Sequence, residues 1–124
     1  MPGMSLGRTE QIVINAADPA RVARFWAVVL GGAVVDRPDG WSYIEGTTGA
    51  EWRPRLSFQP DPAAKTERNR LHLDIRVDDI AAATAEAVAV GATAIGALET
   101  DAQGSFQVLH DPEGNEFCLV MPAS

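Results

Sequence analysis

The sequence predicts an α+β protein built from two tandem modules, each with the element order βαβββ. Three observations predict this class. Alternating apolar and polar residues mark short strands, an aspartate precedes an apolar helical segment twice, and the second half of the chain repeats the order of the first. Gln11 and His72 are 61 positions apart, and so are Asp18 and Asp79. Two copies at this spacing predict two modules that pack as one domain.

The first module is expected at residues 9–60 and begins with a strand that alternates between apolar and polar residues. A helix should follow Asp18, because its carboxylate can accept backbone N–H groups and Pro19 suits the first helical position. Two glycines after Leu30 end this helix. The expected strands of this module cover residues 11–15, 33–37, 41–45 and 55–60.

A polar, proline-bearing segment at residues 61–69 is the expected linker to the second module, at residues 70–122. Asp78 and Asp79 precede the expected helix of this module, and Gly91 should end it. The last two strands are joined by Asp-Pro-Glu-Gly, which is typical of a type I turn. The expected elements are a helix at 80–90 and strands at 71–77, 92–98, 104–110 and 115–121.

Composition narrows the classes of function. With 124 residues, of which 46% are hydrophobic, the chain suits one domain over residues 1–124. A net charge of -7 argues against nucleic acid and anionic membranes as partners. The apolar runs are too short to span a bilayer, no signal-peptide core is evident, and the lone Cys118 suits a reducing compartment, so we expect a cytoplasmic protein.

Three stretches, at residues 17–26, 71–74 and 111–117, together with the paired modules, resemble the vicinal-oxygen-chelate superfamily. The similarity is to its glyoxalase-like, bleomycin-resistance-type members and covers residues 9–122. It implies one glyoxalase/bleomycin-resistance/dioxygenase-type domain, in which the strands curl around an open cavity and the helices lie outside. It also implies a homodimer.

In metal-using members of that superfamily, ligands come from the first and last strands of each module. The matching positions here imply Gln11, His72 and Glu116 as ligands of one divalent metal, which would be nickel, zinc, manganese or iron. The fourth position, on the last strand of the first module, is a glutamate in those relatives. No carboxylate stands at the candidate positions here, which are Pro54, Leu56, Ser57 and Phe58.

Parity along the strands defines the other candidate residues. Glu116 shares a strand face with Cys118, so its carboxylate is expected to point into the cavity, where it could act as a catalytic general base. The alternatives are that Glu116 is a solvated residue at the cavity mouth or that it binds a cationic group of the ligand. His72 and Asp74 also share a face. The alternative to metal ligation is that Asp74 and Arg76 pair with neighbouring residues and that His72 is a hydrogen-bonded residue of the cavity wall. The Cys118 thiol is expected to be a small apolar wall residue.

Several aromatic residues lie on strands or loops of the cavity half, where they can stack on a flat or apolar ligand. The alternative is that most of them pack in the core or at a dimer interface. The residues predicted to line the ligand cavity are Trp41, Tyr43, Trp52, Phe58, Asp74, Phe106 and Cys118.

Three hypotheses of function follow. The first is a protein that binds a small apolar or aromatic molecule in the sheet cavity, with no cofactor and without a full metal site. The alternative is a divalent-metal-dependent lyase, isomerase or dioxygenase that uses Gln11, His72 and Glu116, with the metal polarising a substrate oxygen. The third is a non-catalytic interaction protein that keeps only the dimeric scaffold.

Overall fold

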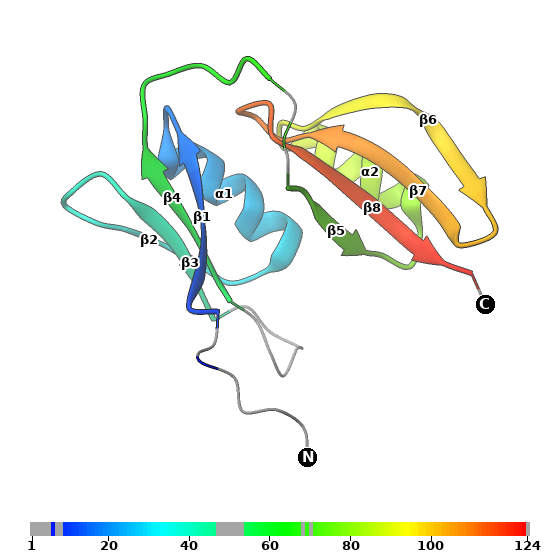
Figure 1. The fold of residues 1–124 in the computed structure, drawn as a ribbon, viewed down its shortest axis with the longest axis horizontal. Coiled ribbons are helices and arrows are strands. Elements are labelled where there is room, and N and C mark those ends of the chain that lie inside the picture. The colour runs from blue at the N-terminus through cyan, green and yellow to red at the C-terminus, as the bar shows by residue number, and fades with distance from the viewer. Residues whose placement is uncertain (1–5, 7–8, 47–53, 68, 70, 124) are drawn as a thin grey trace. The chain divides into compact units, whose positions relative to one another are not determined.

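The chain forms two compact units, each with the element order βαβββ (Figure 1). The computed structural model describes residues 6, 9–46, 54–67, 69 and 71–123. The units are Met1–Pro62 and Ala63–Ser124, and they divide within the segment expected as a linker. The predicted α+β class with two similar modules is confirmed.

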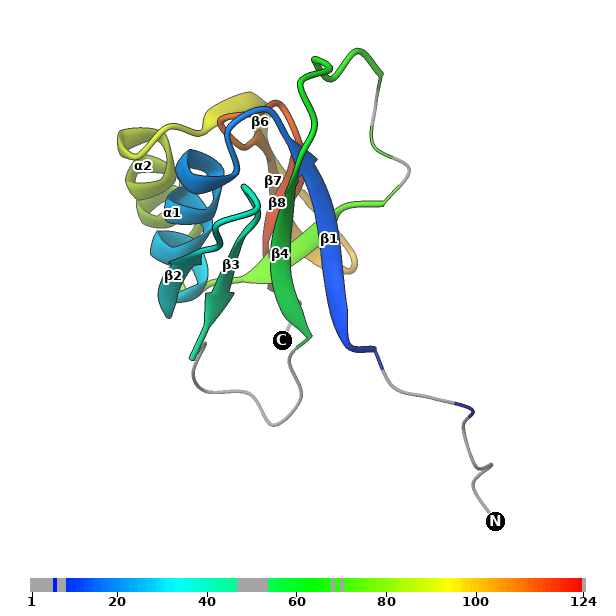
Figure 2. The same cartoon turned by 90° about the vertical axis from the view of Figure 1, so that its left-hand side faces the viewer.

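The first unit contains one four-stranded sheet with the strand order β1-β4-β3-β2 (Figure 2). Strands β1 and β4 are parallel, whereas β4, β3 and β2 form an antiparallel succession. The elements are β1 (Gln11–Ala16), α1 (Pro19–Leu30), β2 (Ala33–Asp36), β3 (Ser42–Glu45) and β4 (Arg55–Pro60).

Helix α1 begins and ends where the sequence predicts. The Asp18 carboxylate accepts a hydrogen bond from the backbone N–H of Arg21 at 3.2 Å, and Pro19 occupies the first turn. Gly31 has a φ of 81°, and its N–H donates to the carbonyl of Ala27 at 2.8 Å. A residue with a Cβ would be strained in this conformation, which explains the glycine at the helix end.

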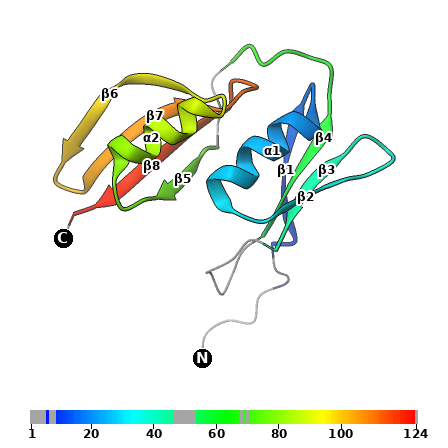
Figure 3. The same ribbon diagram turned by 180° about the vertical axis from the view of Figure 1, so that it is seen from behind.

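One face of the first sheet is covered by α1 (Figure 3). Burying these apolar side chains between helix and sheet is the main stabilising contribution to the unit. The rings of Phe25 and Trp26 meet edge to face, with 5.4 Å between their centroids. The buried residues are Val22, Ala23, Phe25 and Trp26 from the helix, and Ile44, Leu56 and Phe58 from the sheet.

An exposed ion pair joins α1 to β2. Arg24 donates two hydrogen bonds to the Asp36 carboxylate, at 3.2 and 2.8 Å, and the Ser42 hydroxyl donates a third at 2.7 Å. The Arg24 hydrogen bond is the main cause, and the Ser42 hydrogen bond the second, of an Asp36 pKa lowered from the ordinary 3.8 to about 2.

We expect the Asp36 carboxyl group to titrate with a midpoint near pH 2 in an NMR titration of the folded protein. Because the folded pKa lies below the ordinary value of 3.8, this group stabilises the fold above pH 3.8. That contribution is lost as the pH falls from 3.8 to about 2. In an Arg24→Gln variant the midpoint should move toward 3.8, and a midpoint near 3.8 in the unmodified protein would contradict the assignment.

The second unit repeats the arrangement, with the strand order β5-β8-β7-β6 and the parallel pair β5 and β8. Helix α2 covers one face of this sheet (Figure 3), and its core residues are Ile80, Ala87, Leu109, Phe117 and Leu119. The elements are β5 (Leu73–Arg76), α2 (Ile80–Ala89), β6 (Thr93–Asp101), β7 (Gly104–His110) and β8 (Glu116–Pro122).

Strand β6 is longer than the sequence predicts. It continues to Asp101, because its end pairs with the start of β7 in an antiparallel hairpin, and its register shifts between Ile95 and Glu99. The amide of Gln107 donates to the carbonyls of Ile95 and Gly96 in this irregular segment, at 3.3 and 3.1 Å. A side chain of β7 thus supplies hydrogen bonds to backbone carbonyls at the irregular part of the hairpin.

The turn between β7 and β8 is held by Asp111, which is 3% exposed. Its carboxylate accepts from the backbone N–H groups of Glu113 and Asn115, both at 2.9 Å. The predicted turn is confirmed, and an aspartate suits it because its short side chain can bond to the following backbone.

The two helices have 12 and 10 residues. Within the part of the chain that the structure describes, neither helix is long and apolar enough to cross a bilayer.

Candidate ligand-binding site

The second sheet leaves one face uncovered by its helix. Phe117 and Leu119 of β8 point to the core, so Cys118 and Val120, which alternate with them, lie on the open face. In the register, Cys118 stands opposite Asp74 of β5, and Val120 stands opposite Phe106 of β7. The pairing of strands therefore brings polar and apolar side chains from distant parts of the sequence onto one surface.

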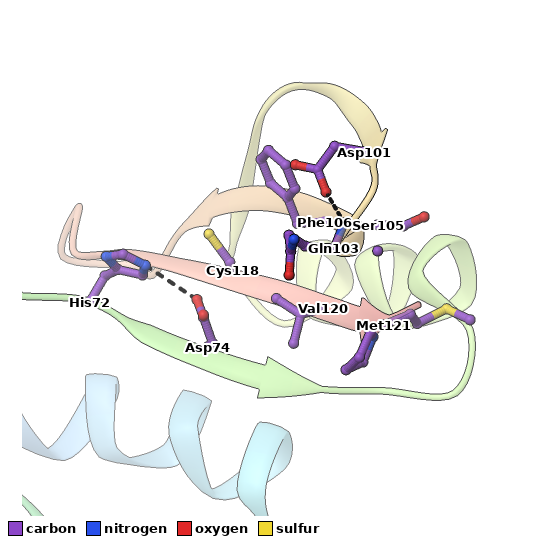
Figure 4. Close-up of a pocket in the computed structure, with 11 residues that line it drawn as sticks. His72, Asp74, Asp101, Gln103, Ser105, Phe106, Cys118, Val120 and Met121 are labelled. Atoms are coloured by element: carbon purple, nitrogen blue, oxygen red, sulfur yellow. Dashed lines mark hydrogen bonds and ion pairs between the residues drawn. The ribbon is translucent and has the colours of Figure 1, made fainter. Parts of the chain in front are cut away.

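A pocket of about 480 Å³ lies on this face (Figure 4). Phe106, Val120 and Met121 contribute apolar surface, while His72 and Asp74 place polar groups at one side. Such a mixture of apolar surface and a few polar groups is typical of small-molecule sites.

Three potential ligand atoms meet at the polar side of the pocket. The His72 imidazole Nε2 lies 3.2 Å from a carboxylate oxygen of Asp74, and the Cys118 sulfur completes a group whose atoms all lie within 4.8 Å of one another. Burial raises the pKa of the Cys118 thiol above its ordinary value, and the negative charges of Asp74 and Glu116 raise it further. The thiol is therefore protonated near neutral pH and is a poor nucleophile in this state.

Glu116 lies on the same face but lines a different pocket, of about 580 Å³, together with His110 and Lys65. Its carboxylate accepts a hydrogen bond from the backbone N–H of Asn69 at 3.1 Å. The family resemblance implies His72 and Glu116 as ligands of one metal. Among the described residues, a separate group of possible metal ligands consists of His72, Asp74 and Cys118.

The first sheet also has an open face, which carries Gln11. The Ser57 hydroxyl donates to the Gln11 side-chain oxygen at 2.6 Å, and Ser57 itself is 1% exposed. Beside them, the Arg55 guanidinium lies 4.2 Å from the centre of the Tyr43 ring. This is a cation-π contact, which holds the charged group over the ring.

The register identifies the fourth of the metal-ligand positions implied by the resemblance. Gln11 of β1 stands opposite Arg55 of β4, and in the second unit the parallel register, continued by one residue, places His72 opposite Glu116. Arg55 is thus the counterpart of Glu116, and the same 61 positions separate them. The four candidates named from the sequence did not include this position, because a pairing between distant strands sets it.

The residues do not fit the family's four-ligand metal centre. A guanidinium stays protonated and cannot ligate a cation, so Arg55 places a positive charge where a carboxylate ligand is needed. The Gln11 oxygen is already an acceptor for Ser57. We therefore assign no reaction step to a metal bound by Gln11, His72 and Glu116.

The predicted aromatic wall residues are distributed over several places. Phe106 lines the pocket of the second unit. Tyr43 lies on the open face of the first sheet. Trp41 lies just before β3, and the Arg37 guanidinium carbon is 5.3 Å from the centre of its ring. Phe58 is 0% exposed and lies on the helix-covered face, so it is a core residue; its alternation with Ser57 indicates this face. Trp52 lies outside the described residues.

Two modules of this kind, each with one sheet face covered by a helix and one left open, define an α+β domain of the vicinal-oxygen-chelate fold. The chain belongs to the glyoxalase-like domain family, whose model matches residues 11–120. No curated protein matches the sequence significantly.

Solved structures with this fold include proteins of different function. A glyoxalase/bleomycin resistance protein/dioxygenase family enzyme from Burkholderia phytofirmans PsJN has a TM-score of 0.75 and 20% identity over 92% of this chain and 98% of that chain. TnmS3, an antibiotic binding protein from Streptomyces sp. CB03234, has a TM-score of 0.68 and 21% identity over 98% and 100%. The oxidase ChaP-H2 has a TM-score of 0.69 and 19% identity over 96% of each chain. At these identities the likeness concerns the fold alone.

Proposed function

We propose that this protein binds a small apolar or aromatic molecule in the pocket of its second unit, without the four-ligand metal centre of metal-using relatives. The observation that carries the proposal is the pocket itself. Its volume of about 480 Å³ lies within the usual range for small-molecule sites, which is about 300–1,000 Å³.

The shape of the wall favours a flat, apolar ligand. Phe106 and Val120 stand side by side on paired strands, and Met121 and Pro122 extend the apolar surface toward the end of β8. An aromatic ligand can stack on the Phe106 ring, and Met121 can adjust to its outline. The His72 and Asp74 pair supplies hydrogen-bonding groups that can orient a polar substituent.

The residues at the family's metal-ligand positions support binding in preference to metal-dependent catalysis. Arg55 stands where the second carboxylate would be. The fold itself is compatible with the binding of small molecules, since one of the similar structures is an antibiotic binding protein.

A thermal-shift screen with aromatic antibiotics and metabolites tests the proposal. We expect at least one compound to raise the melting temperature, and we expect the increase to persist in excess chelator. In a Phe106→Ala variant the affinity for that compound should fall roughly tenfold, which corresponds to about 1.4 kcal/mol. Isothermal titration calorimetry would measure the loss.

A Val28→Ala variant is the matched control, because Val28 lies on the exposed side of α1 and is 58% exposed. Its affinity for the compound should equal that of the unmodified protein. If no compound binds in the presence of chelator, or if both variants lose affinity equally, the proposed pocket is wrong.

A further inference from the structure

The open face of the second sheet carries a cluster that the proposed function does not use as a unit. Asp74 of β5 and Cys118 of β8 are direct partners in a parallel strand pair, and His72 lies two residues before Asp74. Their ligand atoms lie within 4.8 Å of one another, and all three side chains border the same pocket (Figure 4). Two neighbouring strands thus fix the Cα positions of Asp74 and Cys118, and His72 immediately precedes β5.

The three groups are different in kind and suit one class of cation. Imidazole, carboxylate and thiolate are the ligands that bind Zn²⁺ in proteins, at about 2.0–2.3 Å. The Cys118 thiol, which is protonated in the free protein, would release its proton to solvent when it binds the ion. Tetrahedral geometry then separates neighbouring ligand atoms by about 3.3–3.8 Å. The His72 and Asp74 atoms are already 3.2 Å apart, so closure of the Cys118 sulfur onto them needs only small side-chain rotations.

The surroundings also favour a cation. The His72 and Asp74 side chains are 53% and 59% exposed, which leaves them free to rotate toward a bound ion. Glu116 stands two residues from Cys118 on the same strand face and adds a second negative charge nearby. Cys118 forms no disulfide, so its sulfur is available as a ligand.

We propose that His72, Asp74 and Cys118 form a binding site for a thiophilic divalent cation of the Zn²⁺ type, with a fourth coordination position open to the pocket. This set differs from the one implied by the family resemblance, because it uses a thiolate and an aspartate from the second unit in place of Gln11 and Glu116. It resembles zinc sites with three protein ligands, in which water or a ligand occupies the remaining position.

Titration of the reduced full-length protein with Co²⁺ and with Zn²⁺ tests this site. Co²⁺ bound to the Cys118 sulfur should give a sulfur-to-metal charge-transfer band, with one ion bound per chain, and Zn²⁺ should displace it. Cys118→Ser should abolish the band, and His72→Ala and Asp74→Asn should each lower the Zn²⁺ affinity at least tenfold. Glu86→Gln, a matched removal of an exposed carboxylate on α2, should leave the band, the stoichiometry and the Zn²⁺ affinity in place.

Three results would overturn the proposal: no charge-transfer band with Co²⁺, Zn²⁺ binding unchanged in Cys118→Ser, or loss of the band in Glu86→Gln. Far-ultraviolet circular dichroism and thermal melting in chelator would show that each variant folds, and Cys118→Ala provides a second variant at this position. The outcome is separate from that of the proposed function, because the latter is measured in chelator with a Phe106 variant.

Discussion

Replacing Phe58 with alanine should lower the free energy of unfolding by about 3–5 kcal/mol. Phe58 is 0% exposed and lies on the face of the first sheet that α1 covers. Removing the ring takes away its apolar burial and leaves a cavity that its neighbours Leu56 and Ile44 can fill only in part. Urea denaturation followed by circular dichroism would measure the change.

Tyr43 offers the matched control for this experiment. It lies on the adjacent strand, on the opposite and open face, where its ring is half-buried beneath Arg55. Tyr43→Ala should therefore cost less than half as much as Phe58→Ala. Equal losses would contradict the placement of Phe58 in the core. A Phe58→Ala protein with unchanged stability but weaker ligand binding would instead indicate that Phe58 lines a ligand cavity, as expected from the sequence.

A Gly104→Ala substitution should have the second large effect, a loss of about 3 kcal/mol or more in the free energy of unfolding. Gly104 has a φ of 138°, and an added Cβ would lie 2.3 Å from the carbonyl oxygen of Met121. That oxygen belongs to the backbone of β8, which is paired with β7, so it cannot move away without breaking the sheet. Both the backbone strain and the clash must be relieved by distortion.

Gly96→Ala separates these two causes. Gly96 also has a positive φ, of 70°, but nothing lies within 4 Å of its Cβ position. Only the conformational strain remains there, and the expected loss is about 1 kcal/mol. Chemical denaturation would measure the free energy of unfolding of both variants. Similar losses would show that β7 and β8 do not approach closely at Gly104.

Because Gly104 also borders the pocket, the Gly104→Ala variant should bind the aromatic compound more weakly as well.

The sequence by itself determined the elements of this fold and their duplication. Helix starts at Asp18 and Asp79, and the turn at Asp111, depend on hydrogen bonds within a few residues, so their residue types are readable locally. The parity of Glu116 and Cys118 on β8 was equally readable, since side chains alternate along a strand. Phe58 is an exception: it was expected to line the cavity but is buried on the helix-covered face, which its alternation with Ser57 also indicates.

Only the tertiary structure decided which side chains stand together. Strand register sets Arg55 opposite Gln11, and Cys118 opposite Asp74, across pairs that are 44 positions apart in the sequence. A slip of one residue would turn every side chain to the other face, and no local pattern specifies the partner strand's register. Strand pairing therefore places the Arg55 guanidinium at the fourth metal-ligand position, and it also brings His72, Asp74 and Cys118 together. Hydrogen bonds between distant segments fix both arrangements.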